Sequence, residues 1–273
     1  MRFQSTGWTS DRCRGRARVA ALAMFALSSL LSAMPVIAAA LEDTIAAVKP
    51  SIVAVGTFQA TRSPPFAFRG TGFVVGDGTL VATNAHVLPQ TLDNAQLESI
   101  AVAVPGMGGG EAQRREARTV ALDREHDIAI LQLSGNPLPA LSFAEPGAIR
   151  EGRIAAFTGF PIGAVLGLVP VTHRAMIAAI TPIALPSSNA NTLNARVVHR
   201  IQSGSFKVLQ LDATAYPGNS GSPLYDAQTG KVLGIINMVL VKETKEAALS
   251  NPSGISFAIP AEYLRELLAK ARS

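Results

Sequence analysis

The sequence carries the heptapeptide Pro217-Gly218-Asn219-Ser220-Gly221-Ser222-Pro223, in which one serine lies between two glycines. A serine that acts as a nucleophile needs a tight turn that exposes its hydroxyl. It also needs backbone amides that face the oxygen on which negative charge develops. Glycines on both sides remove the side chains that would block such a turn. We therefore expect Ser220 to be a nucleophile, with the amides of Gly218 and Ser220 as its oxyanion hole. A turn of this composition also occurs without a catalytic role, so the prediction depends on its partners.

Two further segments supply the partners that such a serine needs. The segment Ala82-Thr83-Asn84-Ala85-His86-Val87 ends a predicted strand in small residues and delivers a histidine. Imidazole can take the serine proton and return it near neutral pH. The segment His126-Asp127-Ile128-Ala129-Ile130-Leu131 begins an apolar run with an aspartate that can orient His86. Each segment alone fits a structural role. The order His86, Asp127, Ser220 is that of the chymotrypsin-type triad, so the three together predict a catalytic site.

Short apolar runs rich in Val and Ile follow residue 40, and Gly, Pro, Asn and Asp separate them. Many short strands with turn residues between them are typical of an all-β sandwich or barrel. Helices are expected at Leu41–Val48 and after Pro260, with this proline in the first turn. The expected loops include Arg62–Arg69, Pro105–Gly110, Pro161–Pro170 and Pro182–Asn194. The expected strands are Ile52–Phe58, Gly70–Val75, Leu80–Thr83, Ile100–Val104, Ala117–Leu122, Ile128–Leu133, Arg153–Phe157, His173–Ile180, Lys207–Asp212, Ser222–Tyr225, Val232–Leu240 and Gly254–Ile259.

The amino terminus has the three parts of a secretory signal. An arginine-rich stretch precedes the uncharged apolar run Val19–Leu31, and three alanines end at Ala40. We expect residues 1–40 to be removed after Ala40 and residues 41–273 to be the exported domain. The apolar run is shorter than the about 20 residues of a membrane-spanning helix, although an uncleaved anchor stays open. The one cysteine, Cys13, lies in the signal, so the mature protein is expected to have no disulfide and no cysteine metal site.

Composition excludes several classes of function. Hydrophobic residues make up 48% of the chain and charged residues 16%, which supplies a buried core and argues against disorder. The formal charge is +5, but residues 1–40 hold five arginines, and the remainder is nearly neutral. A basic stripe for phosphate groups is missing, so we expect no nucleic-acid partner. The histidines His126, His173 and His199 have no second ligand at metal spacing, and we expect neither a metal nor an organic cofactor.

Four motifs resemble the protease domain of the HtrA/Deg family: Thr83–Val87, Asp127–Leu131, Gly218–Leu224 and Gly254–Pro260. The resemblance covers about residues 41–271. It implies two six-stranded β-barrels of the chymotrypsin/trypsin-like fold and a short C-terminal helix. His86 and Asp127 would come from the first barrel and Ser220 from the second. It also allows a homotrimer, in which Phe66 and Phe68 would be contacts. HtrA proteins commonly carry a PDZ module after the protease, and we expect none here, since the sequence ends soon after Pro260.

The resemblance also guides the prediction of specificity. The strand Gly234–Val239 lacks the histidine that glutamyl endopeptidases use, which argues against cleavage after acidic residues. Thr214, six residues before Ser220, lies where an acid would attract Lys or Arg. Ala215 and Val239 match positions that line the substrate pocket in the family. We therefore expect cleavage after small or medium aliphatic residues.

The loop before the nucleophile is expected to differ from that of digestive relatives in how it is activated. In those relatives, an aspartate before the serine pairs with a newly freed amino terminus. Asn219 is uncharged and cannot form that ion pair, so removal of the signal is not expected to be the activation step. If activity is controlled, loop ordering is the expected form of control, with Gly163–Gly167 as a candidate hinge.

The sequence thus predicts an exported serine endopeptidase, periplasmic or secreted by a bacterium, that acts on protein or peptide substrates without contacting a membrane after signal cleavage. Two other classes stay open. One is a barrel that binds partners without catalysis, and the other is a membrane-tethered interaction protein. Labelling of Ser220 distinguishes the first, and the amino-terminal sequence of the mature protein distinguishes the second.

Overall fold

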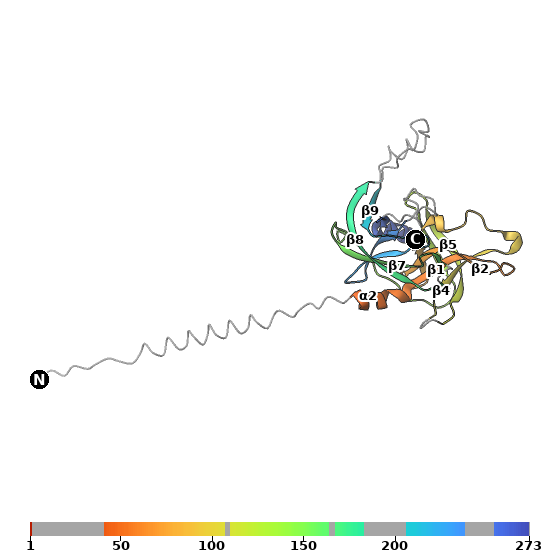
Figure 1. Cartoon of the computed structure of the whole chain (residues 1–273), viewed down its shortest axis with the longest axis horizontal. Helices are drawn as coiled ribbons and strands as arrows, with labels where there is room; N and C mark the ends of the chain where they lie inside the picture. The colour runs from red at the N-terminus through yellow and green to blue at the C-terminus, as the bar shows by residue number, and fades with distance from the viewer. Residues whose placement is uncertain (2–40, 107–109, 164–166, 183–205, 238–253, 273) are drawn as a thin grey trace, which may run out of the picture. The chain divides into compact units, whose positions relative to one another are not determined.

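The computed structural model describes residues 1, 41–106, 110–163, 167–182, 206–237 and 254–272 (Figure 1). The chain divides into two units, Met1–Ala38 and Ala39–Ser273. The predicted signal, apart from Met1, and Cys13 lie outside the described residues. Within the described ranges, no helix is long and apolar enough to cross a membrane.

Twelve strands form two closed antiparallel barrels of six strands each, ordered β1-β2-β3-β6-β5-β4 and β10-β11-β12-β9-β8-β7. This confirms the predicted all-β fold of two six-stranded barrels. The first barrel consists of β1 (Ile52–Phe58), β2 (Phe66–Val75), β3 (Leu80–Thr83), β4 (Ser99–Val104), β5 (Gln113–Asp123) and β6 (Ile128–Leu133). The second consists of β7 (Ile154–Gly159), β8 (Val171–Pro182), β9 (Lys207–Asp212), β10 (Pro223–Asp226), β11 (Val232–Ile236) and β12 (Ile255–Pro260).

Strand β1 illustrates why the central strands read as continuous apolar runs. Its side chains alternate between two clusters, as the period of two in a strand requires. Val53 and Val55 belong to a cluster made of first-barrel residues. Ile52 and Ala54 belong to a larger cluster that also holds second-barrel residues such as Tyr225. Both faces of β1 are therefore buried, one inside its own barrel and one towards the second barrel.

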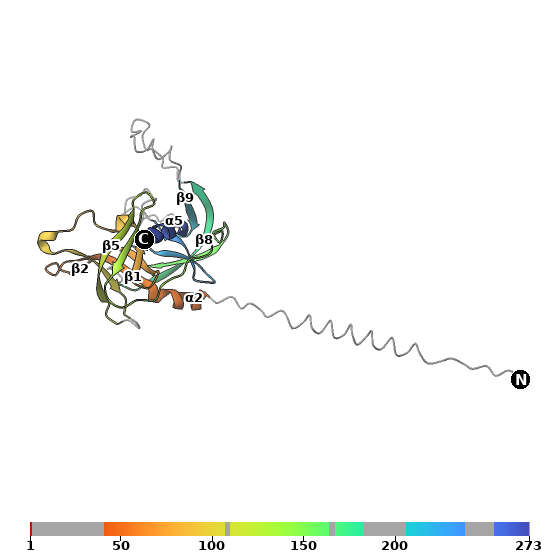
Figure 2. The ribbon, with the colours of Figure 1, turned by 180° about the vertical axis from the view of Figure 1, so that it is seen from behind.

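The helices lie at the two ends of the folded part. α2 (Leu41–Val48) has the predicted bounds, and the short 3₁₀ turns η1 (Lys49–Ser51), η2 (Ala85–Val87) and η3 (Asn94–Gln96) follow along the chain. The predicted terminal helix is α5 (Ala261–Arg272), which contacts β5 and β6 of the first barrel and β11 and β12 of the second (Figure 2). Leu264, Leu267 and Leu268 bury its apolar face in the cluster shared by both barrels.

Several predicted boundaries were wrong, because strand pairing overrides local composition. β2 begins at Phe66 within the predicted loop Arg62–Arg69, since Phe66 pairs with Phe58 across the β1–β2 hairpin. β5 begins at Gln113, because its first residues pair with β4. Pro260 is the last residue of β12 and pairs with Gly234, so it precedes the terminal helix. Ser222 lies in the turn before β10. Residues 107–109, 164–166, 183–194 and 238–240 of the predicted loops and strands lie outside the described residues.

Candidate active site

The fold brings His86 and Asp127 together through the pairing of two neighbouring strands. β3 and β6 are antiparallel partners, with Thr83 opposite Ala129. His86 follows the end of β3 on η2, and Asp127 directly precedes β6, so both lie at the same end of the strand pair. Asp127 adopts the left-handed conformation, with φ of 55°, which is uncommon for a residue other than glycine.

The three predicted triad residues form a continuous chain of hydrogen bonds. The Nδ1 atom of His86 lies 2.5 Å from Oδ2 of Asp127, and the amide of His86 donates to Oδ1 at 2.8 Å. The Nε2 atom of His86 lies 3.0 Å from Oγ of Ser220. A proton on Nδ1, which the carboxylate favours, leaves Nε2 free to accept the serine proton. The side chains of His86 and Asp127 are 30% and 24% exposed, so the pair remains open to substrate.

Asp127 is also held by two asparagines. Its carbonyl accepts hydrogen bonds from the amide of Ala85 at 3.1 Å and from Nδ2 of Asn84 at 3.0 Å. Its carboxylate oxygen Oδ2 accepts from Nδ2 of Asn237 at 2.7 Å. Asn84 belongs to the segment that delivers His86, whereas sequence reasoning assigned no role to Asn237, which lies 110 residues from Asp127 along the chain. The one signal for Asn237 in the sequence is that a polar residue directly follows the apolar strand β11.

The turn around Ser220 requires glycine at two positions. Gly218 and Gly221 have φ of 101° and 86°, which side chains rarely tolerate. A Cβ on Gly218 would lie 2.2 Å from the carbonyl oxygen of Phe160, and one on Gly221 would lie 2.0 Å from that of Thr71. Among the hydrogen bonds of the described residues, the amides of Gly218 and Ser220 have no acceptor. These are the two amides that are expected from the sequence to form the oxyanion hole.

A family model for the trypsin-like peptidase domain matches residues 70–235, more than half of the chain. The chain belongs to this family. The serine protease HTRA2 of Bos taurus mitochondria is 29% identical over 239 residues, which cover 84% of this chain and 42% of the relative. A probable periplasmic DegP-like serine endoprotease of Chlamydia trachomatis is 29% identical over 202 residues, which cover 74% of this chain and 33% of the relative. These relatives confirm the resemblance to the HtrA/Deg family, although the chain spans less than half the length of either.

Solved structures support the same fold. The Rv3671c protease of M. tuberculosis in its active form matches with a TM-score of 0.59 at 24% identity, covering 84% of this chain and 83% of the other. A serine endoprotease of Yersinia pestis matches with a TM-score of 0.58 at 23% identity, and the match covers 85% of this chain and 66% of the other. The likeness at this identity is one of fold alone.

The residues expected to line the substrate pocket are described in part. Thr214 is half-buried in the segment between β9 and the serine turn. Ala215 is 7% exposed and its amide donates to Oγ of Ser256 at 2.8 Å, which fixes the backbone there. Val239 lies outside the described residues. Ser256 in turn donates to the carbonyl of Ala213 at 2.7 Å, so one buried hydroxyl holds both ends of this segment.

The remaining histidines and phenylalanines pack within the described part of the chain. The Nδ1 atom of His126 lies 2.7 Å from Oδ2 of Asp123. The ring of His126 stacks on that of Tyr263, with the ring centroids 4.0 Å apart. His173 stacks on Phe157, and burial lowers its pKa. The described residues include no group of three metal-ligating side chains, and His199 lies outside them. The half-buried rings of Phe66 and Phe68 pack against the core cluster that both barrels share.

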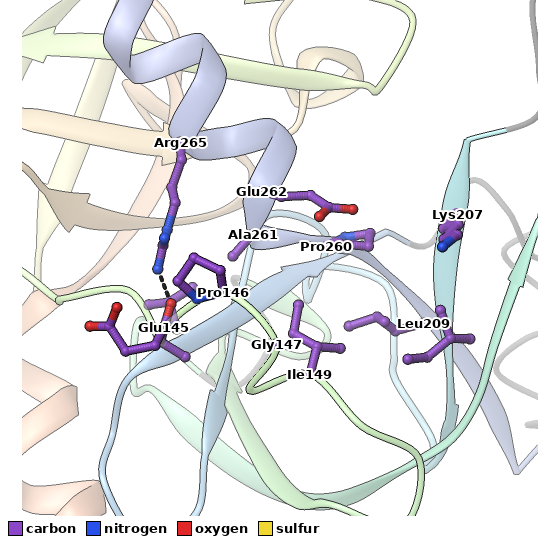
Figure 3. A pocket seen from close by; sticks show the side chains of 13 residues that line it. Glu145, Pro146, Gly147, Ile149, Lys207, Leu209, Pro260, Ala261, Glu262 and Arg265 are labelled. Carbon is purple, nitrogen blue, oxygen red and sulfur yellow. Dashed lines mark hydrogen bonds between the residues drawn. The ribbon is translucent and has the colours of Figure 1, made fainter.

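A cavity of about 240 Å³ lies beside α5, on the second barrel (Figure 3). None of the three predicted triad residues lines it. The guanidinium of Arg265 donates to the carbonyl of Ala144 beside the cavity. Figure 3 shows Ile149, Leu209 and Pro260 along the wall. The cavity is therefore separate from the candidate active site.

Proposed function

We propose that this chain is a serine endopeptidase that hydrolyses peptide bonds through an acyl-enzyme on Ser220. The observation that carries the proposal is the chain of hydrogen bonds from Asp127 through His86 to Ser220, with 2.5 Å and 3.0 Å between the paired atoms. The arrangement has a nucleophile, a base within hydrogen-bond reach and a group that orients the base. The family to which the chain belongs supports the same reaction.

The mechanism follows from the positions of these atoms. Oγ of Ser220 attacks the carbonyl carbon while Nε2 of His86 takes its proton, and the amides of Gly218 and Ser220 hold the oxyanion. Asp127 keeps the ring of His86 oriented and stabilises its positive charge. The C–N bond then breaks as His86 returns the proton to the leaving amine. Water, deprotonated by His86, releases the acyl group and restores Ser220. The reaction needs no metal or organic cofactor.

We also propose cleavage after small or medium aliphatic residues such as Val, Ala or Ile. Thr214 is uncharged at the place where an acid would attract Lys or Arg, and Ala215 contributes a small apolar side chain. Profiling with a peptide library is the test, and cleavage mainly after Arg or Glu would contradict the proposal.

Residues 1–40 are proposed as a secretory signal and residues 41–273 as the protease domain, which would act on exported proteins in the periplasm or outside a bacterial cell. The apolar run Val19–Leu31 supports this, as does a relative named periplasmic, whereas another relative is named mitochondrial. Amino-terminal sequencing of the mature protein should begin at Leu41, and retention of Met1 would contradict signal cleavage. Light scattering on the same sample tests the homotrimer that the family resemblance allows.

Labelling of the purified full chain with a fluorophosphonate tests the activity directly. We expect the wild type and the control Ser142→Ala, which changes an exposed serine outside the triad, to be labelled equally. Ser220→Ala should lose all labelling and lower peptide hydrolysis by several orders of magnitude, with its circular dichroism unchanged. A wild type that is folded but unlabelled would favour a barrel that binds partners without catalysis.

A further inference from the structure

Thr71 of the first barrel forms hydrogen bonds with the turn of the second barrel that holds Ser220. Thr71 lies in β2 and is 0% exposed. Its hydroxyl donates to the carbonyl of Gly218 at 2.7 Å and accepts from the amide of Phe160 at 3.1 Å. Its own amide donates to the carbonyl of Ser220 at 2.8 Å. Thr71 thus makes three hydrogen bonds to the second barrel, and two of them end on the residues whose amides face the proposed oxyanion.

The directions of those carbonyls decide where the neighbouring amides point. A peptide unit is planar, so holding its carbonyl also fixes the N–H at its other end. Between Pro217 and Gly221 four peptide units follow one another, and each carbonyl has a donor. Thr71 holds the carbonyls of Gly218 and Ser220, whose peptide units carry the amides of Asn219 and Gly221. The carbonyls of Pro217 and Asn219, whose units carry the amides of Gly218 and Ser220, accept from the amides of Ile162 at 2.7 Å and Ser222 at 3.0 Å. The unit held by the Thr71 hydroxyl therefore lies between the two units with the proposed oxyanion amides.

Gly218 is the position at which this turn is easiest to reorient. Glycine has no Cβ and populates positive and negative φ with similar ease, so its two flanking peptide units have little intrinsic preference for the observed direction. The hydroxyl of Thr71 is the donor among the described residues that meets the carbonyl on the C-terminal side of this glycine. Without that donor, the half-buried carbonyl would lose this partner, and the turn would shift towards conformations that satisfy it.

We propose that Thr71 is a positioning residue for the oxyanion hole: its hydroxyl holds the Gly218 carbonyl across the barrel interface and so fixes the peptide unit that lies between the two units carrying the amides of Gly218 and Ser220. The inference rests on the proposed endopeptidase function. It assigns to the first barrel a second task besides holding His86 and Asp127. It also explains why a hydroxyl is buried on β2 at a point where the neighbouring positions are Gly70 and Gly72.

Three variants of the full chain separate this task from a general structural one. Thr71→Val keeps the shape of the side chain and the backbone amide but removes the hydroxyl. Thr71→Ser keeps the hydroxyl and should rescue the effect. Thr158→Val is the matched control, because Thr158 is also 0% exposed and also uses its hydroxyl in two hydrogen bonds, to Thr172 and Tyr225.

The first measurement is the rate of fluorophosphonate labelling. We expect Thr71→Val to react about 10- to 100-fold more slowly than the wild type, because it removes both the donor to the Gly218 carbonyl and the acceptor of the buried Phe160 amide. Thr71→Ser and Thr158→Val should stay close to the wild-type rate. The pH at which the rate of Thr71→Val is half-maximal should not move, because His86 and Asp127 are untouched and only the plateau falls. A wild-type rate in Thr71→Val, or an equal loss in Thr158→Val, would overturn the proposal.

The second measurement does not depend on activity. Hydrogen exchange is followed by mass spectrometry in the peptide that contains Asn219, whose amide donates to the carbonyl of Tyr216 at 2.9 Å. Exchange there should be faster in Thr71→Val and unchanged in Thr71→Ser. If the wild type were not labelled at all, the proposed function would fail. In that case, faster exchange in Thr71→Val would still support the positioning role of Thr71, and unchanged exchange in the turn would refute it.

Discussion

Adding one methyl group at Gly218 should disable the oxyanion hole while leaving the barrels folded. Gly218 has φ of 101°, and alanine in such a conformation costs about 1–3 kcal/mol. The new Cβ would lie 2.2 Å from the carbonyl oxygen of Phe160, so the turn must move by roughly 1 Å to reach an ordinary contact. An oxyanion donor works at about 2.7–3.1 Å, and a displacement of that size removes it. We therefore expect Gly218→Ala to lower the rate of acylation by about 100- to 1,000-fold, the effect of losing one donor.

The assay is the initial rate of fluorophosphonate labelling, with thermal unfolding followed by circular dichroism on the same samples. Gly152→Ala is the matched control, since Gly152 has φ of 79° and a Cβ there would meet nothing within 4 Å. It should lose a similar amount of stability through backbone strain and keep its full labelling rate. A Gly218→Ala protein labelled as fast as the wild type would refute the assignment of the Gly218 amide. Equal losses of activity in both variants would show that strain alone is responsible.

Two other changes test the hydrogen bonds around the site and in the second barrel. Asn237→Leu removes the donor to Asp127 at 2.7 Å, a bond to a charged group worth about 1.5–3 kcal/mol, and should slow peptide hydrolysis about 10- to 100-fold. An unchanged rate would mean that His86 alone orients the carboxylate. Burial raises the pKa of Asp226, but hydrogen bonds from Arg153 and Thr229 outweigh this effect and hold the pKa below the usual 3.8. A carboxyl group whose pKa is lower in the folded than in the unfolded state stabilises the protein above about pH 4. This stabilisation is lost on further acidification. Asp226→Asn should therefore unfold more easily at pH 7, by about 1–3 kcal/mol, and depend less on pH between 5 and 3 in urea titrations. Parallel pH dependence in the two proteins would contradict this.

Much of the fold could be read from local patterns. The bounds of α2 and β1 were predicted to the residue, because a proline follows the helix and a mostly apolar, Val- and Ile-rich run defines the strand. The start of β2 could not be predicted in this way. The segment around Pro64 and Pro65 has the composition of a loop, whereas Phe66 is placed in the strand by its pairing with Phe58. Such a pairing depends on the hairpin as a whole.

Some residues of the candidate site could likewise be predicted from local sequence, and others could not. His86, Asp127 and Ser220 were recognisable because each chemistry needs a particular residue type in a particular local setting, and because their order is diagnostic. Asn237 and Thr71 were not recognisable, since a buried asparagine or threonine has many uses. Their contacts with Asp127 and Gly218 join residues that lie 110 and 147 positions apart.

The sequence by itself therefore determined the class of fold, the residues proposed to carry out acyl transfer and the two glycines that shape the serine turn. These features follow from periodicity, side-chain chemistry and backbone freedom, which are properties of short segments. The tertiary structure alone decided which side chain supports Asp127 and which hydroxyl reaches the carbonyl of Gly218. Those contacts arise only when two barrels pack against each other, because hydrogen bonds between distant segments depend on the position of every strand that separates them.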